Sequence, residues 1–166
     1  MDKVTENDVK RYLNEWFRKR GREASETEVQ LPPMKYGDKT TKPDVLAFRK
    51  RANTVYLIEC KRATRLRYIG HGFGQILATK LAFRKMRKTE LKKKLMRETG
   101  KERIGDLKFE FGVAFPKQHV NASKSIQRMI TMFQNLPQFK DFTVYVASKD
   151  KVQRKHRGRA IRYDKL

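Results

Sequence analysis

Hydrophobic and polar positions alternate along this chain with two different periods. Residues 9, 12, 13, 16 and 17 are apolar and repeat every three or four positions, which predicts a helix with one buried face between Thr5 and Gly21. Thr5 and Asp8 have the spacing of a capping box at the start of this helix. The same periodicity predicts a second helix over 69–86 and a third within 121–137.

Other segments have the composition and the alternation of β-strands. Residues 44–50 and 54–61 are two short β-rich runs, and the few residues between them predict a hairpin. Two further strands are predicted over 107–116 and 142–148, while 27–33 is predicted to be a weak strand and 34–42 a loop. The order of helix, hairpin, helix, strand, helix and strand predicts a single α/β domain in which helices flank a mixed β-sheet.

Charge narrows the range of partners. The chain of 166 residues has 41 Lys and Arg against 18 Asp and Glu, a formal net charge of +23. A chain of this charge most often binds a polyanion, so nucleic acid is the favoured partner and an anionic membrane surface the second. Two segments concentrate the charge: a predicted basic helical insertion at 84–106, and a basic C-terminal tail at 149–166 that forms a short hairpin or stays mobile.

Cysteine content and the length of apolar runs indicate the compartment. The single cysteine excludes an intramolecular disulfide. No apolar run approaches the roughly 20 residues needed to span a bilayer, and the N-terminal residues lack the apolar region of a signal peptide. We therefore expect an intracellular, cytoplasmic protein with no membrane partner, and its source can be viral or archaeal.

Charged residues stand at the ends of two apolar runs. Glu59 and Lys61 share one face of the strand over 54–61, because side chains alternate along a strand. If the hairpin is paired, the Asp44 carboxylate lies near Glu59, and a divalent cation relieves the repulsion between two close carboxylates. We therefore predict a Mg²⁺ or Mn²⁺ site made by Asp44, Glu59 and the backbone carbonyl of Cys60. Lys61 is predicted to orient a water molecule, accept its proton or neutralise charge.

The acid-x-Lys spacing is not distinctive by itself, because the chain contains four such triplets. Only Glu59-Cys60-Lys61 ends an apolar, strand-like run that follows a Pro-Asp strand. A structural ion pair between strand ends is the alternative explanation of the same residues.

Pro43-Asp44 followed by Glu59-Cys60-Lys61 resembles the motif of the PD-(D/E)xK nuclease superfamily, which has the restriction-endonuclease-like fold. The resemblance covers residues 5–85 by motif and the later strand-helix-strand by element order. It is nearest in style to archaeal Holliday-junction resolvases and RecB-like nucleases. It implies a Mg²⁺-dependent deoxyribonuclease, an endonuclease or exonuclease that hydrolyses phosphodiester bonds. It also implies that Asp44 and Glu59 are metal ligands and that Lys61 is the catalytic lysine.

The resemblance suggests two further site residues. Many members of the superfamily carry a Glu on the first helix that faces the metal site, and Glu6 and Glu15 are the candidates. Glu6 falls within the apolar arc of the helix and Glu15 falls outside it, so Glu6 is preferred, although an acid is also favoured at any helix start. RecB-like members carry Gln-xxx-Tyr on the next helix, where this chain has Gln75 with Thr79. Gln75 therefore contacts DNA or is an exposed helical amide.

Basic residues outside the motif are the predicted nucleic-acid contacts. No base-reading module is evident, so we expect backbone and shape recognition with an affinity that depends on salt. The predicted contacts are Arg62, Arg65, Arg67, Lys80, Arg84, Lys88, Lys92, Lys93, Arg154, Arg157 and Arg159. A non-catalytic nucleic-acid-binding module of the same fold and a basic RNA-associated protein are the alternatives, and a homodimer is compatible with the sequence. Junction, flap, end and internal duplex site all remain as substrates.

Overall fold

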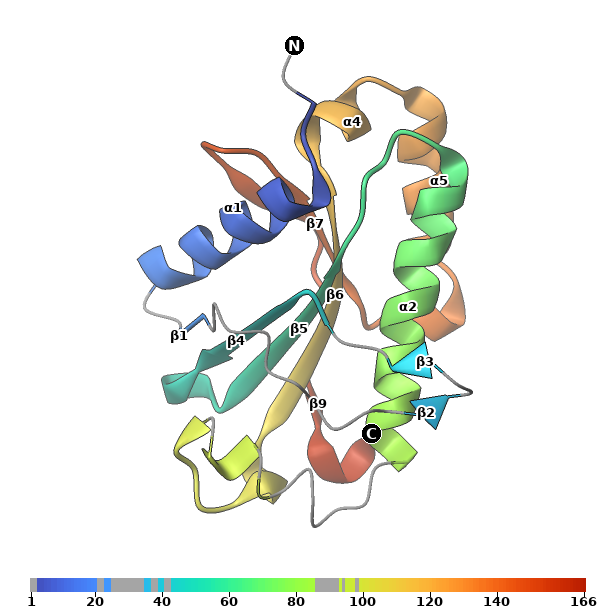
Figure 1. Cartoon of the computed structure of the whole chain (residues 1–166). Coiled ribbons are helices and arrows are strands. Elements are labelled where there is room, and N and C mark those ends of the chain that lie inside the picture. Colours follow the sequence, from blue (N-terminus) through green and yellow to red (C-terminus); the bar gives the residue numbers. More distant parts are fainter. Residues whose placement is uncertain are drawn as a thin grey trace.

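The computed structural model describes residues 3–20, 23–24, 35–36, 39–40, 43–85, 93, 95–97 and 99–166 (Figure 1). The predicted weak strand at 27–33 lies outside this part of the chain. Within 34–42, where the sequence predicted loop, β2 (Lys35–Tyr36) and β3 (Lys39–Thr40) pair antiparallel instead.

One mixed sheet forms the centre of the molecule. Over the described residues it has seven strands: β1 (Glu23–Ala24), β4 (Val45–Arg49), β5 (Thr54–Cys60), β6 (Lys108–Pro116), β7 (Thr143–Ala147) and β8 (Val152–His156) in that spatial order, with β9 (Ile161–Arg162) also paired to β6. The contacts of β5 with β6 and of β6 with β7 are parallel, and the others are antiparallel. The prediction of an α/β chain with a mixed sheet between helices is therefore confirmed.

The strands β5 and β6 are the centre of this sheet because their side chains are apolar on both faces. All seven residues of β5 are buried, and so are all residues of β6 except Lys108. The predicted hairpin is present: β4 and β5 pair antiparallel through the 3₁₀ turn Lys50–Ala52 and Asn53, which has a positive φ of 48°. Glu59 and Cys60 thus belong to a strand that is buried along its whole length, while Asp44 directly precedes β4 and Lys61 directly follows β5.

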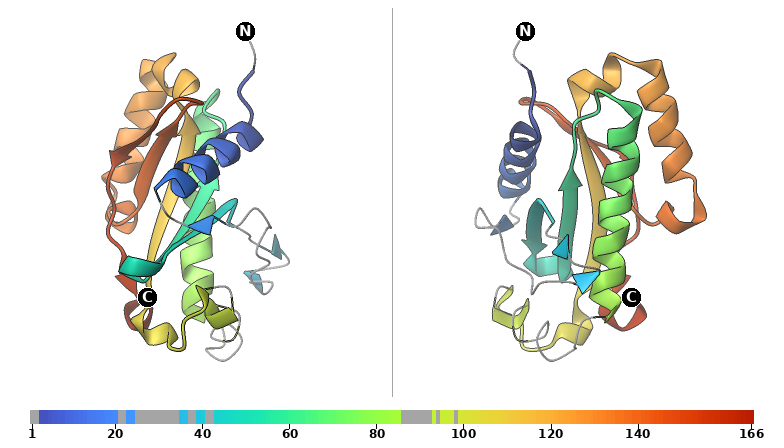
Figure 2. Two further views of the ribbon diagram at one scale, coloured as in Figure 1. Left: turned by 90° about the vertical axis from the view of Figure 1, so that its left-hand side faces the viewer. Right: turned by 45° about the vertical axis from the view of Figure 1, so that its right-hand side comes forward.

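Helices cover both faces of the sheet (Figure 2). The helix α1 (Glu6–Lys19) packs on one face through Val9, Leu13 and Phe17, which are spaced four residues apart. The helices α2 (Leu66–Lys85), α4 (Lys117–Asn121) and α5 (Lys124–Gln134) lie toward the other face. No helix in the described part of the chain combines the length and the apolar character needed to cross a bilayer.

The start of α1 is fixed by the predicted capping box. The Asp8 N–H donates to Thr5 Oγ1 at 3.2 Å, and the Thr5 N–H donates to Asp8 Oδ2 at 2.8 Å. Two N–H groups at the helix end are satisfied in this way. The cap therefore sets where Glu6, the first helical residue, begins.

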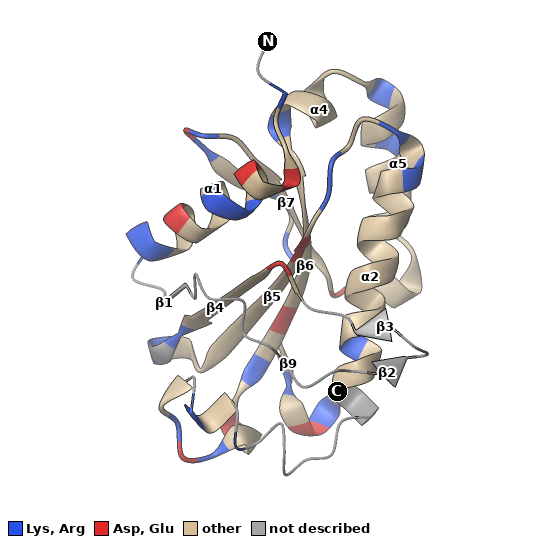
Figure 3. Cartoon of the chain, viewed as in Figure 1, with Lys and Arg blue, Asp and Glu red and all other residues tan. Residues whose placement is uncertain are grey.

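The two basic segments have different structures (Figure 3). In the predicted helical insertion, residues 93, 95–97 and 99 are helical, and Leu95 is buried in the core that α2 covers. The predicted C-terminal tail forms no hairpin of its own: β8 pairs with β7, and β9 pairs with the start of β6. The tail is therefore part of the central sheet.

Candidate functional site

The hairpin register places two carboxylates opposite each other. Val45 pairs with Ile58, so Asp44 and Glu59 face each other at the next position of the antiparallel ladder. Glu59 is only 5% exposed, while Asp44 is half-buried. The two predicted acids therefore meet where β5 ends and the chain leaves the sheet.

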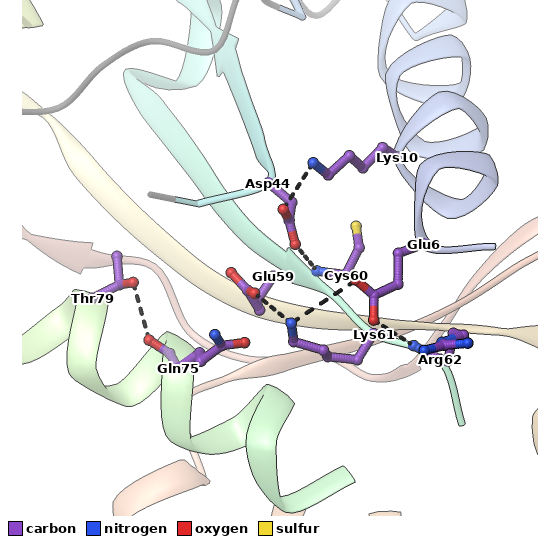
Figure 4. A network of polar contacts seen from close by, with 9 residues as sticks. All are labelled: Glu6, Lys10, Asp44, Glu59, Cys60, Lys61, Arg62, Gln75 and Thr79. Carbon is purple, nitrogen blue, oxygen red and sulfur yellow. Dashed lines mark hydrogen bonds and ion pairs between the residues drawn. The ribbon is translucent and has the colours of Figure 1, made fainter. Parts of the chain in front are cut away.

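Two lysines from different elements accompany the carboxylates (Figure 4). Lys61 Nζ lies 3.4 Å from Glu59 Oε1, and Lys10 Nζ of α1 lies 2.9 Å from Asp44 Oδ1. The Cys60 N–H donates to Asp44 Oδ2 at 2.8 Å. Both oxygens of Asp44 thus have a partner, and Glu59 is paired with Lys61, the residue directly after β5.

Of the two acids proposed on the first helix, the structure brings Glu6 to the site. Glu6 Oε2 lies 4.0 Å from Lys61 Nζ, and Glu6 Oε1 accepts a long hydrogen bond of 3.5 Å from the Arg62 N–H. Glu15 is exposed and lines a surface pocket with Arg11 and Lys149. Glu6 therefore joins the first turn of α1 to the end of β5.

Burial and charge together disfavour the ionised form of Glu59. Loss of hydration, and then the neighbouring Asp44 carboxylate, raise the pKa of Glu59 to about 8, although the Lys61 ammonium acts in the opposite direction. With Glu59 ionised, the carboxylates of Glu6, Asp44 and Glu59 would face two ammonium groups, Lys10 and Lys61, and one negative charge would be left uncompensated. Protonation of Glu59, or a cation bound beside it, would remove this excess.

The backbone of Cys60 supports the third predicted ligand. In an extended strand the N–H and the C=O of one residue point to the same side. The Cys60 N–H points to Asp44, whereas the next N–H, of Lys61, donates to Ala114 O of β6 at 3.0 Å. The Cys60 carbonyl is thus directed to the Asp44 side. Its thiol is fully buried in the core beneath α1, which raises the pKa of the thiol well above the ordinary value.

The helix α2 approaches the site closely because it carries a glycine there. A Cβ on Gly72 would lie 2.9 Å from Val113 Cγ2 of β6 and 3.2 Å from Lys61 Cγ. Gln75 follows three residues later on the same face of the helix, and its side chain extends to the side of the site where Glu59 and Lys61 lie (Figure 4). Thr79, one helical turn further on, is buried and donates to the Gln75 carbonyl at 3.0 Å.

Three residues that support the site were not predicted from the sequence. Lys10 is one helical turn after Glu6, and this spacing is the signal that could have identified it. His119 of α4 accepts a hydrogen bond at Nδ1 from the Ala63 N–H at 3.2 Å, and its pKa is lowered by burial and by Arg62. No local pattern marks His119 or Gly72, because both act through the packing of distant elements.

The predicted nucleic-acid contacts fall into separate places. Arg62 and Arg65 are exposed on the connection from β5 to α2, directly after Lys61, and Arg67 is exposed in the first turn of α2. Lys80 packs over the Phe142 ring and Arg154 over the Trp16 ring, at 5.5 and 5.4 Å from the ring centroids. Lys93, Arg157 and Arg159 are exposed, whereas Lys88, Lys92 and the side chain of Arg84 lie outside the described part.

The donor set fits a Mg²⁺ or Mn²⁺ ion. Each carboxylate oxygen has two lone pairs, so the contacts of Asp44 with Cys60 and Lys10 leave it acceptor capacity. Over the described residues there is no group of three or more His, Cys, Asp or Glu side chains that would enclose a metal. Asp44, Glu59 and the Cys60 carbonyl would instead leave several positions to water and phosphate. Mg²⁺ is usually held in that way, through one or two carboxylates.

Comparisons of the chain with protein-family models, with curated proteins and with solved structures find no significant match. The resemblance to nucleases therefore rests on Pro43-Asp44, on Glu59-Cys60-Lys61 and on the order of the elements. A functional assignment therefore depends on the geometry of these residues and not on homology to a known protein.

Proposed function

We propose that this protein is a Mg²⁺- or Mn²⁺-dependent deoxyribonuclease of the restriction-endonuclease-like fold. The observation that carries the proposal is the closeness of Asp44 to the buried Glu59 at the position that follows the Val45–Ile58 pair, with Lys61 Nζ 3.4 Å from Glu59 Oε1. The neighbouring Asp44 carboxylate helps to raise the pKa of Glu59, and a divalent cation between the two carboxylates would relieve their repulsion. The net charge of +23 supports a polyanionic substrate.

Each residue of the site has a role that its position supports. Asp44, Glu59 and the Cys60 carbonyl would hold the metal, which supplies charge neutralisation at a scissile phosphate and a lowered pKa for a bound water. Lys61 stands beside Glu59 with its side chain 17% exposed, so its ammonium can orient water and offset negative charge on the phosphate. Glu6 limits the movement of Lys61 from the side of α1, and Gln75 offers an amide from α2 to the substrate.

A cleavage assay tests the proposal. Supercoiled, linear duplex, single-stranded, flap and four-way-junction DNA are incubated with the protein in EDTA, in Mg²⁺ and in Mn²⁺. We expect metal-dependent cleavage of at least one of them, and its loss in Asp44→Ala and Lys61→Ala. The matched control is Lys108→Ala, which removes the exposed lysine of another acid-x-Lys triplet, Asp106-Leu107-Lys108, at the start of the neighbouring strand β6.

Metal binding gives a second readout that does not depend on turnover. Titration calorimetry with Mn²⁺ should show binding by wild type and by Lys108→Ala, and weak or no binding by Asp44→Ala. The proposal is refuted if all five DNAs survive in both metals, or if Lys61→Ala cleaves as fast as Lys108→Ala. Tight, salt-sensitive DNA binding without cleavage would then favour a non-catalytic binding module, and a preference for structured RNA would favour an RNA-associated protein.

A further inference from the structure

The connection from β5 to α2 and the first turn of α2 together carry a cluster that the metal site does not use. Residues 62–68, here called the arginine loop, contain Arg62 and Arg65 of the connection and Leu66, Arg67 and Tyr68 of the first helical turn. The three arginines are exposed, and the basic residues of this connection are visible in blue in Figure 3. The loop follows Lys61 directly, so whatever it binds lies beside the substrate of the site.

Two arginines of the loop are held on one aromatic ring. The guanidinium carbons of Arg62 and Arg67 lie 5.2 and 5.1 Å from the centroid of the Tyr68 ring, and Arg67 Nη2 donates to the Tyr68 hydroxyl at 3.4 Å. The two charges are therefore within about 10 Å of each other, roughly one Debye length at 0.1 M salt, and repel. The hydrogen bond from Arg67 and the surrounding arginines lower the pKa of the Tyr68 phenol, as a concentrated positive charge should.

Leu66 is an unusual neighbour for these charges. It is 44% exposed, and in the described part of the chain Met132 is the other large apolar side chain exposed to a comparable extent, at 53%. A single exposed leucine needs no explanation on an ordinary surface. Here it stands between two arginines, next to a half-buried tyrosine, so apolar and aromatic surface is offered together with phosphate-binding groups.

The start of the loop is anchored to two helices. The Arg62 N–H donates to Glu6 of α1, and the Ala63 N–H donates to His119 of α4. These bonds fix the backbone between the catalytic lysine and the arginines. A preorganised loop loses less freedom when a ligand binds, so the cluster is suited to binding rather than to solvation alone.

We propose that the arginine loop binds a nucleic-acid strand where its bases are unpaired, with Leu66 and Tyr68 against base faces and the three arginines on the adjoining phosphates. Aromatic and apolar side chains interleaved with cations contact unstacked bases in this way, whereas a closed duplex presents mainly phosphate. The inference rests on the proposed function for the nature of the ligand, and it specifies the substrate as DNA with unpaired nucleotides beside the scissile bond.

Binding of the metal-free protein tests the inference without cleavage. Fluorescence anisotropy in EDTA compares an intact duplex, the same duplex with a short single-stranded gap, and the single strand. We expect wild type to bind the gapped duplex at least about fivefold more tightly than the intact one, the contribution of about one stacked base. Leu66→Ala and Tyr68→Ala should lose most of this ratio, while Met132→Ala, the matched loss of an exposed apolar side chain on α5, should keep it.

Two further measurements separate stacking from charge and from misfolding. Arg65→Ala should weaken binding to both duplexes alike and lower the slope of log affinity against log salt by about one. A 2-aminopurine in the gap should be quenched when wild type binds, a readout that needs no variant. Equal affinity for gapped and intact duplex, a ratio kept in both loop variants, or unchanged 2-aminopurine fluorescence overturns the inference.

Failure of the inference differs from failure of the proposed function. Lys61→Ala should keep the binding preference although it loses cleavage. Metal-dependent cleavage together with equal binding of gapped and intact duplex refutes the loop proposal alone. A clear preference together with no cleavage of any DNA refutes the nuclease and leaves the loop as a binding surface.

Discussion

Gly72 and Gly74 offer a matched pair of substitutions in the same turn of α2. A Cβ added to Gly72 would lie 2.9 Å from Val113 Cγ2 and 3.2 Å from Lys61 Cγ, closer than the roughly 3.5–4.0 Å of favourable carbon contacts. Gly74 has no heavy atom within 4 Å of an added Cβ. The methyl group of an alanine would therefore overlap with packed side chains at position 72 and would lie in open space at position 74.

The pair isolates the packing cost. Each Gly→Ala change gains about 1 kcal/mol of helix propensity, and this gain cancels when the two variants are compared. Val113 is fully buried in the central strand, so the added methyl at 72 overpacks the core, which costs about 1–3 kcal/mol. Gly74→Ala should unfold above wild type, and Gly72→Ala should unfold about 2–12 °C below Gly74→Ala, at about 2–4 °C per kcal/mol for a chain of this size.

Thermal unfolding followed by circular dichroism measures the difference, and cleavage measured well below both transitions adds a functional readout. A methyl at 72 displaces the stem of Lys61, whose Nζ is 3.4 Å from Glu59, so we expect at least about a tenfold loss of cleavage by Gly72→Ala and none by Gly74→Ala. If the two variants unfold at the same temperature, α2 does not pack on β6 at Gly72 as described, and the positioning of Lys61 by this helix is wrong.

Three further substitutions test other parts of the structure. The pKa of Glu59 is about 8 in the folded protein and ordinarily 4.5, so folding of the metal-free protein favours the protonated form and its unfolding free energy should fall by about 3 kcal/mol from pH 5 to pH 8. Urea denaturation in EDTA measures this loss, which should be much smaller in Glu59→Gln. An equal dependence on pH in both proteins would contradict the prediction. Tyr145→Phe removes a hydroxyl that donates to the buried Glu110 at 3.1 Å and should lower stability by about 1–2 kcal/mol in the same denaturation assay, while an unchanged midpoint would count against the bond. Thr5→Ala removes half of the capping box and should cost about 1 kcal/mol in a thermal scan, with Thr5→Ser retaining most of it.

The elements with a strong local pattern were predictable, and the edges of the sheet were not. The helix α1 follows from its cap and its apolar spacing, and β5 from its unbroken apolar run. The strand β8 has the sequence Val-Gln-Arg-Lys-His, of which Val152 alone is buried, so it lacks the alternation by which a strand is recognised. Its conformation comes from pairing with β7, which is contact between distant segments.

The contacts of the candidate site likewise include some that the sequence predicts and some that it does not. The approach of Asp44 to Glu59 could be predicted because a short hairpin connection fixes the register of its two strands. The contact of His119 with the loop after Lys61 could not, since it depends on where α4 is placed by packing. The position of Lys10 could be predicted in part. Its spacing from Glu6 places both residues on one face of α1, but only the packing of α1 on the sheet shows that this face lies against Asp44 and Lys61.

The central sheet contains two buried carboxylates, Glu59 and Glu110, whose surroundings differ. Glu110 of β6 is 9% exposed, and its Oε1 accepts from the hydroxyls of Thr143 at 2.7 Å and Tyr145 at 3.1 Å, neutral donors that suit a permanently buried acid. Glu59 is buried as deeply, yet it faces another carboxylate, and its ion pair with Lys61 at 3.4 Å is longer than the 2.7–2.9 Å of a strong charge-assisted hydrogen bond. A purely structural ion pair would gain stability from a shorter contact and from the absence of Asp44. An added cation would stabilise the arrangement around Glu59, and this supports the proposed metal site over a structural ion pair, whereas the neutral donors around Glu110 suit a structural role.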